Sequence, residues 1–227
     1  MNLRASARAA AILLAAGLPG LFGPARVAAQ GYDISAGWGG GYISYAPFVK
    51  QGTAAPADIG LGATWVALLQ AETWHLRRWV GLRVGGFYSR GTVTYPTAQK
   101  QTSVYGAELA GLVRIIPPAP DRIGTVYLIG GGGLMWYQLG EGPTVPIADA
   151  GVTYNADDRR QWMLLGGGGI ELMTGLTAFD GELGVRFEGV DQISLSRPFR
   201  EIGGPDPDMM HNLRFSVMLF SGVPKLF

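Results

Sequence analysis

Apolar side chains recur at every second position through most of this chain, and this period-two pattern restricts the fold more than any other feature. In residues 58–70 they alternate with small residues such as Gly60, Gly62 and Thr64. Such alternation is typical of a β-strand whose two faces meet different surroundings. Helical periodicity is weak, and after Gln30 no apolar run is long enough for a spanning helix. The pattern therefore predicts an all-β fold.

Eight runs of this kind can be counted, separated by breaks rich in glycine, proline and aspartate. The runs cover residues 32–45, 58–70, 79–90, 103–116, 123–139, 161–172, 181–193 and 211–220. Short breaks fall at 71–78, 117–122 and 173–180, and mostly longer ones at 46–57, 91–102, 140–160 and 194–210. Short turns at one end and long polar loops at the other are typical of outer-membrane barrels, as is an even number of strands.

The face opposite the bulky side chains is made largely of glycine and alanine. The chain has 36 glycines and only 15% charged residues, and lysine is nearly absent from the runs. A soluble sandwich would place Lys, Thr, Glu and Gln on this second face, whereas small residues suit the crowded interior of an eight-stranded barrel. The bulky face suits acyl chains and an interfacial aromatic girdle. We expect a closed antiparallel up-and-down transmembrane β-barrel of about eight strands, with the sandwich as the alternative.

The charges inside the runs share the parity of the small residues. An arginine on the lipid face at the bilayer midplane costs about 2–4 kcal/mol, so this parity favours the lumen. Their signs are mixed, which predicts a structural network of ion pairs that plugs the lumen. Arg83 and Glu108 lie on neighbouring strands and are the best single pair. The alternative is eight exposed charges on a sandwich. The network comprises Arg83, Glu108, Arg114, Glu171, Glu182, Arg186, Glu188 and Arg214.

Three glycine clusters interrupt the alternation, at residues 39–41, 130–133 and 166–169. We interpret them as bulges and coiling points that a small barrel requires. A phosphate-binding loop is disfavoured, because none of them precedes a helix start or a Gly-Lys-Ser/Thr sequence. The run 123–139 is hydrophobic on both faces, so its orientation stays open.

The first thirty residues predict a secretory signal peptide. Arg4 and Arg8 precede an apolar stretch at 9–18, and Val27-Ala28-Ala29 places small residues at −3 and −1. We expect cleavage near Ala29/Gln30, which leaves residues 31–227 as the barrel. The alternative is an uncleaved membrane anchor at 9–25, which glycines and prolines interrupt.

Charge and cysteine content exclude several classes of protein. The 18 Lys and Arg nearly balance the 17 Asp and Glu, which argues against a nucleic-acid binder. The absence of cysteine excludes a disulfide scaffold, a thiolate zinc site, an Fe–S cluster and a lipidated N-terminal cysteine. We expect no cofactor and no metal.

In its signal, its strand–turn rhythm, the run Gly166-Gly-Gly-Gly-Ile-Glu-Leu172 and its closing strand, the chain resembles the small eight-stranded outer-membrane barrels of the OmpA/OmpX type. The resemblance implies export to the outer membrane of a Gram-negative-type bacterium. It also implies contact with outer-membrane lipid and lipopolysaccharide, and folding by the barrel assembly machinery as a monomer. That machinery recognises an aromatic-ended last strand, for which Phe215, Phe220 and Phe227 are the candidates. Pro224 is a poor strand residue and leaves the choice open.

Few residues suggest catalysis. His75 falls in a predicted turn, and His211 opens the last run, after a segment that holds serines and acids. Lipid-modifying enzymes of the outer membrane pair His with Ser or an acid at the rim, but no serine has the spacing that they use. We therefore expect no enzyme. The residues of the preceding segment are Asp191, Ser194, Ser196, Glu201, Asp206 and Asp208.

Charged residues of the long segments offer a further binding hypothesis. Asp157, Asp158, Asp206 and Asp208 suit Ca²⁺ or cation bridges to lipopolysaccharide. Nearby arginines suit lipid phosphates, namely Arg159, Arg160, Arg197 and Arg200. The alternative is solvated loop charge. The predicted function is structural or surface-interacting through four long loops. The alternatives are an OmpW-like conduit for small or hydrophobic molecules and, less favoured, a lipid-modifying enzyme.

Overall fold

The computed structural model describes residues 33–48, 60–76, 78–94, 99–116, 124–138, 145–147, 152–154, 159–178, 181–195 and 209–222. The predicted signal peptide at 1–30 lies outside these residues. Within them, no helix is long and apolar enough to cross a membrane, a finding that does not concern spanning strands.

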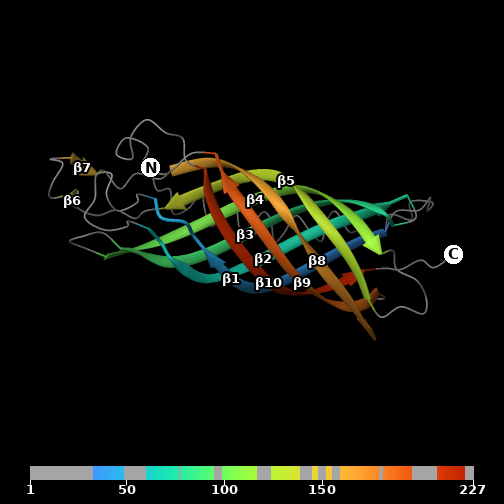
Figure 1. Ribbon diagram of the computed structural model, residues 1–227. Helices are drawn as coiled ribbons and strands as arrows, with labels where there is room; N and C mark the ends of the chain where they lie inside the picture. The colour runs from blue at the N-terminus through green and yellow to red at the C-terminus, as the bar shows by residue number, and fades with distance from the viewer. Residues whose placement is uncertain are drawn as a thin grey trace, which may run out of the picture. The chain divides into compact units, whose positions relative to one another are not determined.

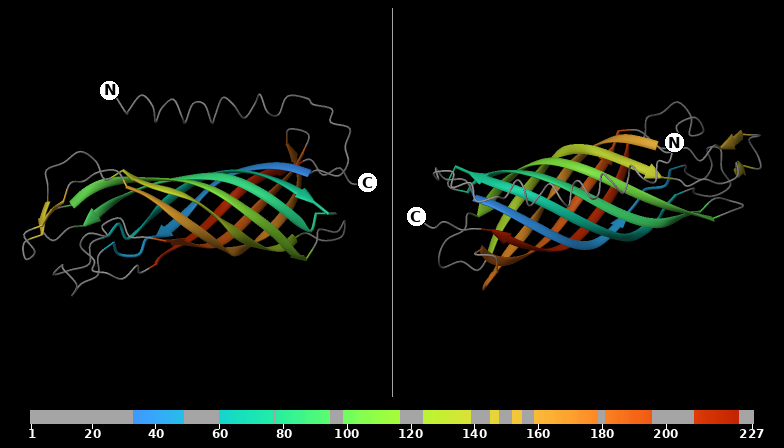
Figure 2. Two further views of the ribbon diagram at one scale, coloured as in Figure 1. Left: turned by 90° about the horizontal axis from the view of Figure 1, so that it is seen from above. Right: turned by 180° about the vertical axis from the view of Figure 1, so that it is seen from behind.

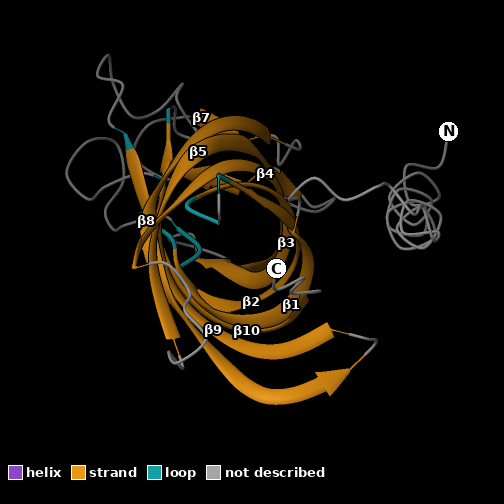
Figure 3. Cartoon of the chain, turned by 90° about the vertical axis from the view of Figure 1, so that its right-hand side faces the viewer, coloured by secondary structure: helices purple, strands orange, loops and turns teal. Residues whose placement is uncertain are grey.

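In the described part of the chain, eight strands close into an antiparallel barrel, as predicted (Figures 1 and 3). Their order around the ring is β1-β10-β9-β8-β5-β4-β3-β2. Each barrel strand therefore pairs with the barrel strands that precede and follow it in the chain, β5 pairs with β8, and β10 pairs with β1. The bounds are β1 Asp33–Ser44, β2 Ala63–His75, β3 Val80–Thr94, β4 Gln99–Ile116, β5 Gly124–Gln138, β8 Arg159–Ala178, β9 Gly181–Ser194 and β10 Met210–Gly222.

The strands are strongly staggered. When cross-strand partners are followed once around the barrel from Asp33, the path returns to β1 at Ile43, ten residues further on. With a rise of about 3.3 Å per residue and a strand spacing of about 4.8 Å, this shift tilts the strands by about 40° to the barrel axis. The tilt is visible in Figure 2. The backbone cylinder then has a radius of about 8 Å, which side chains fill.

Side chains alternate between the lumen and the outside along every strand of the barrel. On β2, Trp65 and Leu69 are exposed, whereas Val66 and Leu68 between them are buried. The orientation of β5, which the sequence left open, is settled in the same way. Tyr127 points into the lumen and its neighbour Leu128 points out. The core of the molecule is therefore the lumen.

Two of the predicted long segments contain strand structure. Residues 91–102 were expected to be a long loop, but β3 continues to Thr94, β4 begins at Gln99, and these two residues pair. The prediction failed because Thr92, Thr94 and Gln101 are polar and end the apolar alternation, although the backbone pairing continues. Within 140–160, β6 (Val145–Ile147) pairs with β7 (Val152–Tyr154).

The glycine clusters are not bulges, which corrects the prediction. Register shifts in the barrel occur at Arg114/Ile116 and Met173/Thr177, outside the clusters. The inward glycines lie where the neighbouring strand approaches closely. A Cβ on Gly131 would meet the carbonyl oxygen of Leu109 and come within 2.6 Å of the Cα of Ala110. Because glycine has no side chain, neighbouring strands can coil tightly here while the hydrogen-bond ladder between them stays regular.

Adjacent glycines of β5 provide a test of this account. Gly131→Ala places a methyl group against β4 and is expected to lower the free energy of unfolding by about 1–3 kcal/mol. Gly130→Ala is the control, because its Cβ has no atom within 4 Å. We expect it to leave stability unchanged or slightly raised. Urea unfolding of the two variants in detergent measures the difference, and equal midpoints would contradict the close approach.

Candidate functional site in the barrel lumen

Eight charged side chains of the described residues are buried in the lumen, four arginines and four glutamates. None is more than 8% exposed. Equal numbers of opposite charges make this interior electrically neutral, which favours burial at low dielectric. The residues are Arg83, Arg114, Arg186, Arg214, Glu72, Glu108, Glu171 and Glu188.

Glu72 on β2 is the most heavily bonded of the acids. Its Oε1 accepts hydrogen bonds from Arg186 Nη2 at 2.5 Å, Trp74 Nε1 at 2.9 Å and Ser35 Oγ at 3.1 Å. Its Oε2 accepts from Arg83 Nε at 3.2 Å and Arg83 Nη2 at 3.1 Å. Five donors therefore replace the water that this carboxylate loses on burial.

Glu171 on β8 extends the contacts to the other side of the lumen. Its Oε1 accepts from Arg186 Nη2, and its Oε2 accepts from Arg114 Nη2 at 2.7 Å. The guanidinium of Arg114 also lies 3.6 Å from the ring centroid of Trp74, which is a cation–π contact. Arg186 thus bridges two glutamates whose strands lie on different parts of the wall.

Glu188 on β9 completes this group. Its Oε1 lies 2.7 Å from Arg83 Nη1 and accepts a hydrogen bond of 2.5 Å from the hydroxyl of Tyr127. All three guanidinium nitrogens of Arg83 are now bonded to carboxylates. We call the connected charges the central cluster, which consists of Glu72, Arg83, Arg114, Glu171, Arg186 and Glu188.

A separate pair crosses the lumen nearer the end from which β2, β4 and β10 start. Arg214 on β10 donates to both oxygens of Glu108 on β4, at 2.5 and 3.0 Å. Gln192 Nε2 donates to the same carboxylate at 2.7 Å. We call Glu108 and Arg214 the upper pair. Two parallel N–H···O bonds fix its geometry more tightly than a single contact would.

Aromatic and apolar side chains close the lumen above the upper pair. Phe48, from the segment after β1, is fully buried, and its ring packs edge-on against Tyr137 at 5.3 Å between centroids. Tyr45 is also buried and lies 6.2 Å from Tyr137. The backbone N–H of Ala46 donates to Asn212 Oδ1 at 3.1 Å, which ties this segment to β10. The mouth of the barrel is therefore covered by its own chain.

The outer surface has the opposite character. Large apolar side chains such as Leu82, Val113 and Phe215 are between 48% and 64% exposed. Aromatic side chains form two cross-strand rows towards the same end as the upper pair. The rows are Tyr42–Trp65 and Tyr88–Tyr105–Trp136. Aromatic residues gathered towards one end of an apolar band are typical of the girdles found at membrane interfaces.

The expected pairing of Arg83 with Glu108 is wrong. Arg83 bonds to Glu72 and Glu188, and Glu108 bonds to Arg214. Glu108 is opposite Gly85 rather than Arg83, so it lies two residues further along the strand pair. Closure brings β10 across the lumen to Glu108, and the order of strands alone does not reveal this contact.

The lumen also contains a charge that the sequence pattern did not predict, Glu72. The second apolar run ends at Gln70 in the sequence, which predicts a turn at Glu72 and Trp74, whereas β2 continues to His75. Alternation could have predicted this, because Gln70, Glu72 and Trp74 occupy every second position and so continue the inward face of the run. The side chain of Glu182, a predicted member of the network, lies outside the described residues.

The residues considered for catalysis and disfavoured in the sequence lie outside the lumen or apart from one another. His211 Nδ1 is 2.7 Å from Asp191 Oδ2, and both side chains are partly exposed on the outer face. Ser194 is buried on the opposite face and bonds to Asn212. His75 ends β2. Among the described residues, no group of three or more His, Asp or Glu side chains could hold a metal.

Other predicted residues lie at the surface, in the lumen or beyond the described part of the chain. Phe215 points outward, whereas Phe220 is buried 4.6 Å below the guanidinium of Arg186. Arg160 is exposed on β8, and only the backbone of Arg159 is described. The remaining candidates lie outside the described residues, namely Phe227, Asp157, Asp158, Arg197, Arg200, Ser196, Glu201, Asp206 and Asp208.

No family model and no curated protein matches the chain. Among solved structures, it is similar to Ail, the attachment invasion locus protein of Yersinia pestis, with 9% identity over 84% of this chain and 99% of that chain, at a TM-score of 0.42. The same protein with the heparin analogue sucrose octasulfate gives 10% identity over the same shares and a TM-score of 0.44. The outer membrane protein OprG from Pseudomonas aeruginosa gives 9% identity over 85% and 95% of the chains and a TM-score of 0.39.

Double-mutant cycles can test the assignment of partners. We expect Arg214→Met and Glu108→Met to be strongly coupled, because each single change strands a buried charge at a cost of about 3–5 kcal/mol and the double change removes both charges. Arg83→Met and Glu108→Met should add independently, since they belong to different groups. Urea unfolding gives the coupling energies. Strong coupling of Arg83 with Glu108, and none with Arg214, would contradict the assignment.

Proposed function

We propose that this protein is a non-enzymatic integral outer-membrane barrel with a closed lumen, and that it acts through the end of the barrel that faces outward from the cell. One observation carries the proposal. Charged side chains are buried inside the barrel, and large apolar side chains cover its outside. A soluble protein would have the reverse arrangement, because water solvates charges and excludes apolar surface.

The outer surface supports placement in a bilayer. Exposed apolar side chains occur on strands all around the barrel, including Trp38, Leu109, Leu164 and Val217. Soluble monomers rarely expose a contiguous apolar patch of more than a few hundred Å², whereas exposed large apolar side chains occur here on every strand of the barrel. Closure of the sheet pairs the backbone groups that hydrocarbon cannot solvate. Lipid is therefore the surrounding that this surface fits.

The lumen supports a closed state. The central cluster spans it with contacts from β2, β3, β4, β8 and β9, and the upper pair and the cap formed by Phe48 lie above. Moving an ion past these groups would break charge-assisted hydrogen bonds between buried side chains. Function then falls to the outer surface and to the segments between β1 and β2, β5 and β8, and β9 and β10.

Location and partners follow as parts of the same proposal. The chain is exported by its signal at residues 1–30 and folded by the barrel assembly machinery. It lies as a monomer among the lipids and lipopolysaccharide of a Gram-negative-type outer membrane. The short turns face the periplasm, which puts the aromatic rows and the cap at the extracellular end. The pair His211–Asp191 has a structural role here, since Ser194 faces the lumen.

Single cysteines test the placement in lipid directly, because the chain has none of its own. Bimane-labelled cysteines at Leu82, Val113 and Phe215 should show blue-shifted emission that is quenched by doxyl lipids in vesicles, since these positions point outward from the apolar band. Gln99→Cys is the control and should be quenched by aqueous iodide. Quenching of the three band positions by iodide rather than by lipid would show that they face water.

Planar bilayer recordings test the closed lumen. The mature chain should show no stepwise conductance, and Phe48→Ala should also stay silent, because the central cluster still fills the lumen below the cap. Replacing Arg186, which bridges Glu72 and Glu171, by Ala should allow ion passage. Steady conductance of the unmodified protein would refute the closed lumen and favour the conduit.

A further inference from the structure

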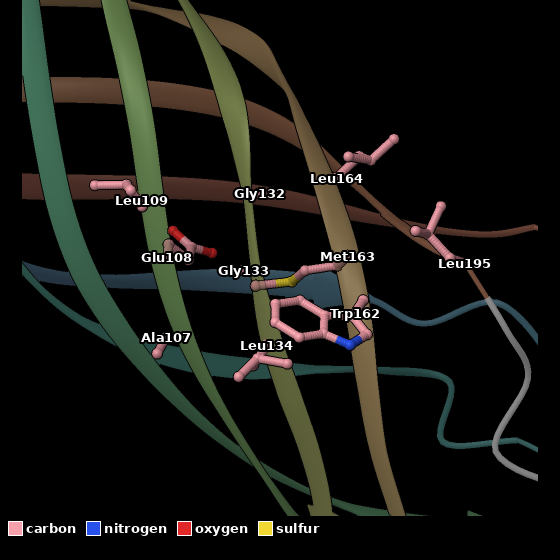
Figure 4. A pocket seen from close by; sticks show the side chains of 10 residues that line it. All are labelled: Ala107, Glu108, Leu109, Gly132, Gly133, Leu134, Trp162, Met163, Leu164 and Leu195. Atoms are coloured by element: carbon pink, nitrogen blue, oxygen red, sulfur yellow. The ribbon is translucent and has the colours of Figure 1, made fainter.

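The outer wall carries an apolar groove between β4, β5 and β8. Gly132 on β5 has no side chain, and its cross-strand partners Leu109 and Leu164 stand on either side of it. Leu134 and Trp162, the next outward pair along these strands, form the upper part of the walls. Figure 4 shows Gly132 between the two leucines. The groove has a volume of about 530 Å³, and Glu108 is the one charged residue among its otherwise apolar or glycine lining.

The groove ends at the level of the aromatic rows. Trp162 lines it, and Arg160 is the next outward residue above Trp162 on β8. Arg160 is exposed and pairs across strands with Trp136, the last member of the row Tyr88–Tyr105–Trp136. In a membrane this row marks the boundary between acyl chains and headgroups. In a membrane, the guanidinium of Arg160 would therefore lie at the level of the headgroups, above a groove that lies among the acyl chains.

A second groove on the same barrel provides a comparison. It has a volume of about 670 Å³ and lies between Phe187 and Phe215 on β9 and β10. β5 and β8 line it as well. Among the described side chains, no outward arginine lies on β1, β5, β9 or β10, and Arg160 on β8 is eight residues from Gly168, the nearest β8 residue of this groove. The two grooves are therefore similar in size, and they differ in that, among the described residues, only the groove between β4, β5 and β8 lies next to an outward arginine, Arg160.

We propose that the groove between β4, β5 and β8 binds one phosphorylated lipid of the outer leaflet. One acyl chain lies in the slot over Gly132, and a headgroup phosphate is bound by the guanidinium of Arg160. The charge complementarity of an arginine with a phosphate selects this occupant. Burial of one acyl chain against the apolar lining supplies the remaining affinity. This inference rests on the proposed function, which places this end of the barrel in the outer leaflet.

Native mass spectrometry of the mature chain in a neutral detergent, titrated with bisphosphorylated lipid A, tests the proposal. Arg160→Gln removes the cation, and Ala107→Phe fills the groove from a lining position that points outward. Each change should weaken binding of lipid A about tenfold. The matched controls are Arg90→Gln and Ala67→Phe, which alter an outward arginine and an outward alanine on β3 and β2. Both controls should bind as the unmodified chain does.

The other outcomes overturn the proposal. If Ala107→Phe weakens binding but Arg160→Gln does not, the groove accepts any acyl chain and has no phosphate site. If all four variants weaken binding, lipid A is held non-specifically around the barrel. If none does, the groove is not the site, and a mass that corresponds to two chains would mean that a second copy occupies it. Heat-modifiable gel migration of every variant checks folding separately, so a failure of the barrel itself is recognised.

Discussion

Closure of the sheet is the constraint on which the rest of this structure depends. An open sheet leaves a row of unpaired backbone groups at each edge, and pairing β10 with β1 removes both edges. Closure with a shift of ten residues over the strands of the barrel fixes both their tilt and the width of the interior. The interior is then so narrow that an arginine on one side of the lumen can contact a glutamate on the opposite side.

The character of the lumen follows from that width. Arg186 reaches Glu72, which is 114 residues away in the chain, and Arg214 reaches Glu108 across a separation of 106. Pairing these charges offsets much of the free-energy cost of removing them from water, and it leaves the interior electrically neutral. Aromatic rings add to this, since Trp74 packs against Arg114 and Tyr127 bonds to Glu188. One set of contacts thus stabilises the barrel and also obstructs it.

Glycine shapes both faces of the wall. Inward glycines such as Gly131 allow neighbouring strands to approach where a Cβ would contact the backbone. Outward glycines such as Gly132 have a different consequence, because they leave gaps between leucines on the outer face of the barrel. The same small residue therefore permits tight coiling on one side and creates grooves on the other.

The sequence alone determined the all-β class, the approximate strands and the inward face of seven of the eight predicted charges, because period two is a local property of an extended chain. It also showed the inward parity of Arg83, Glu108 and Arg186. Tertiary structure alone decided which charges meet, how far β3 and β4 extend beyond the apolar band, and that Glu72 belongs to the lumen. Those features depend on register and closure, which join residues more than a hundred positions apart and leave no periodic trace in the sequence.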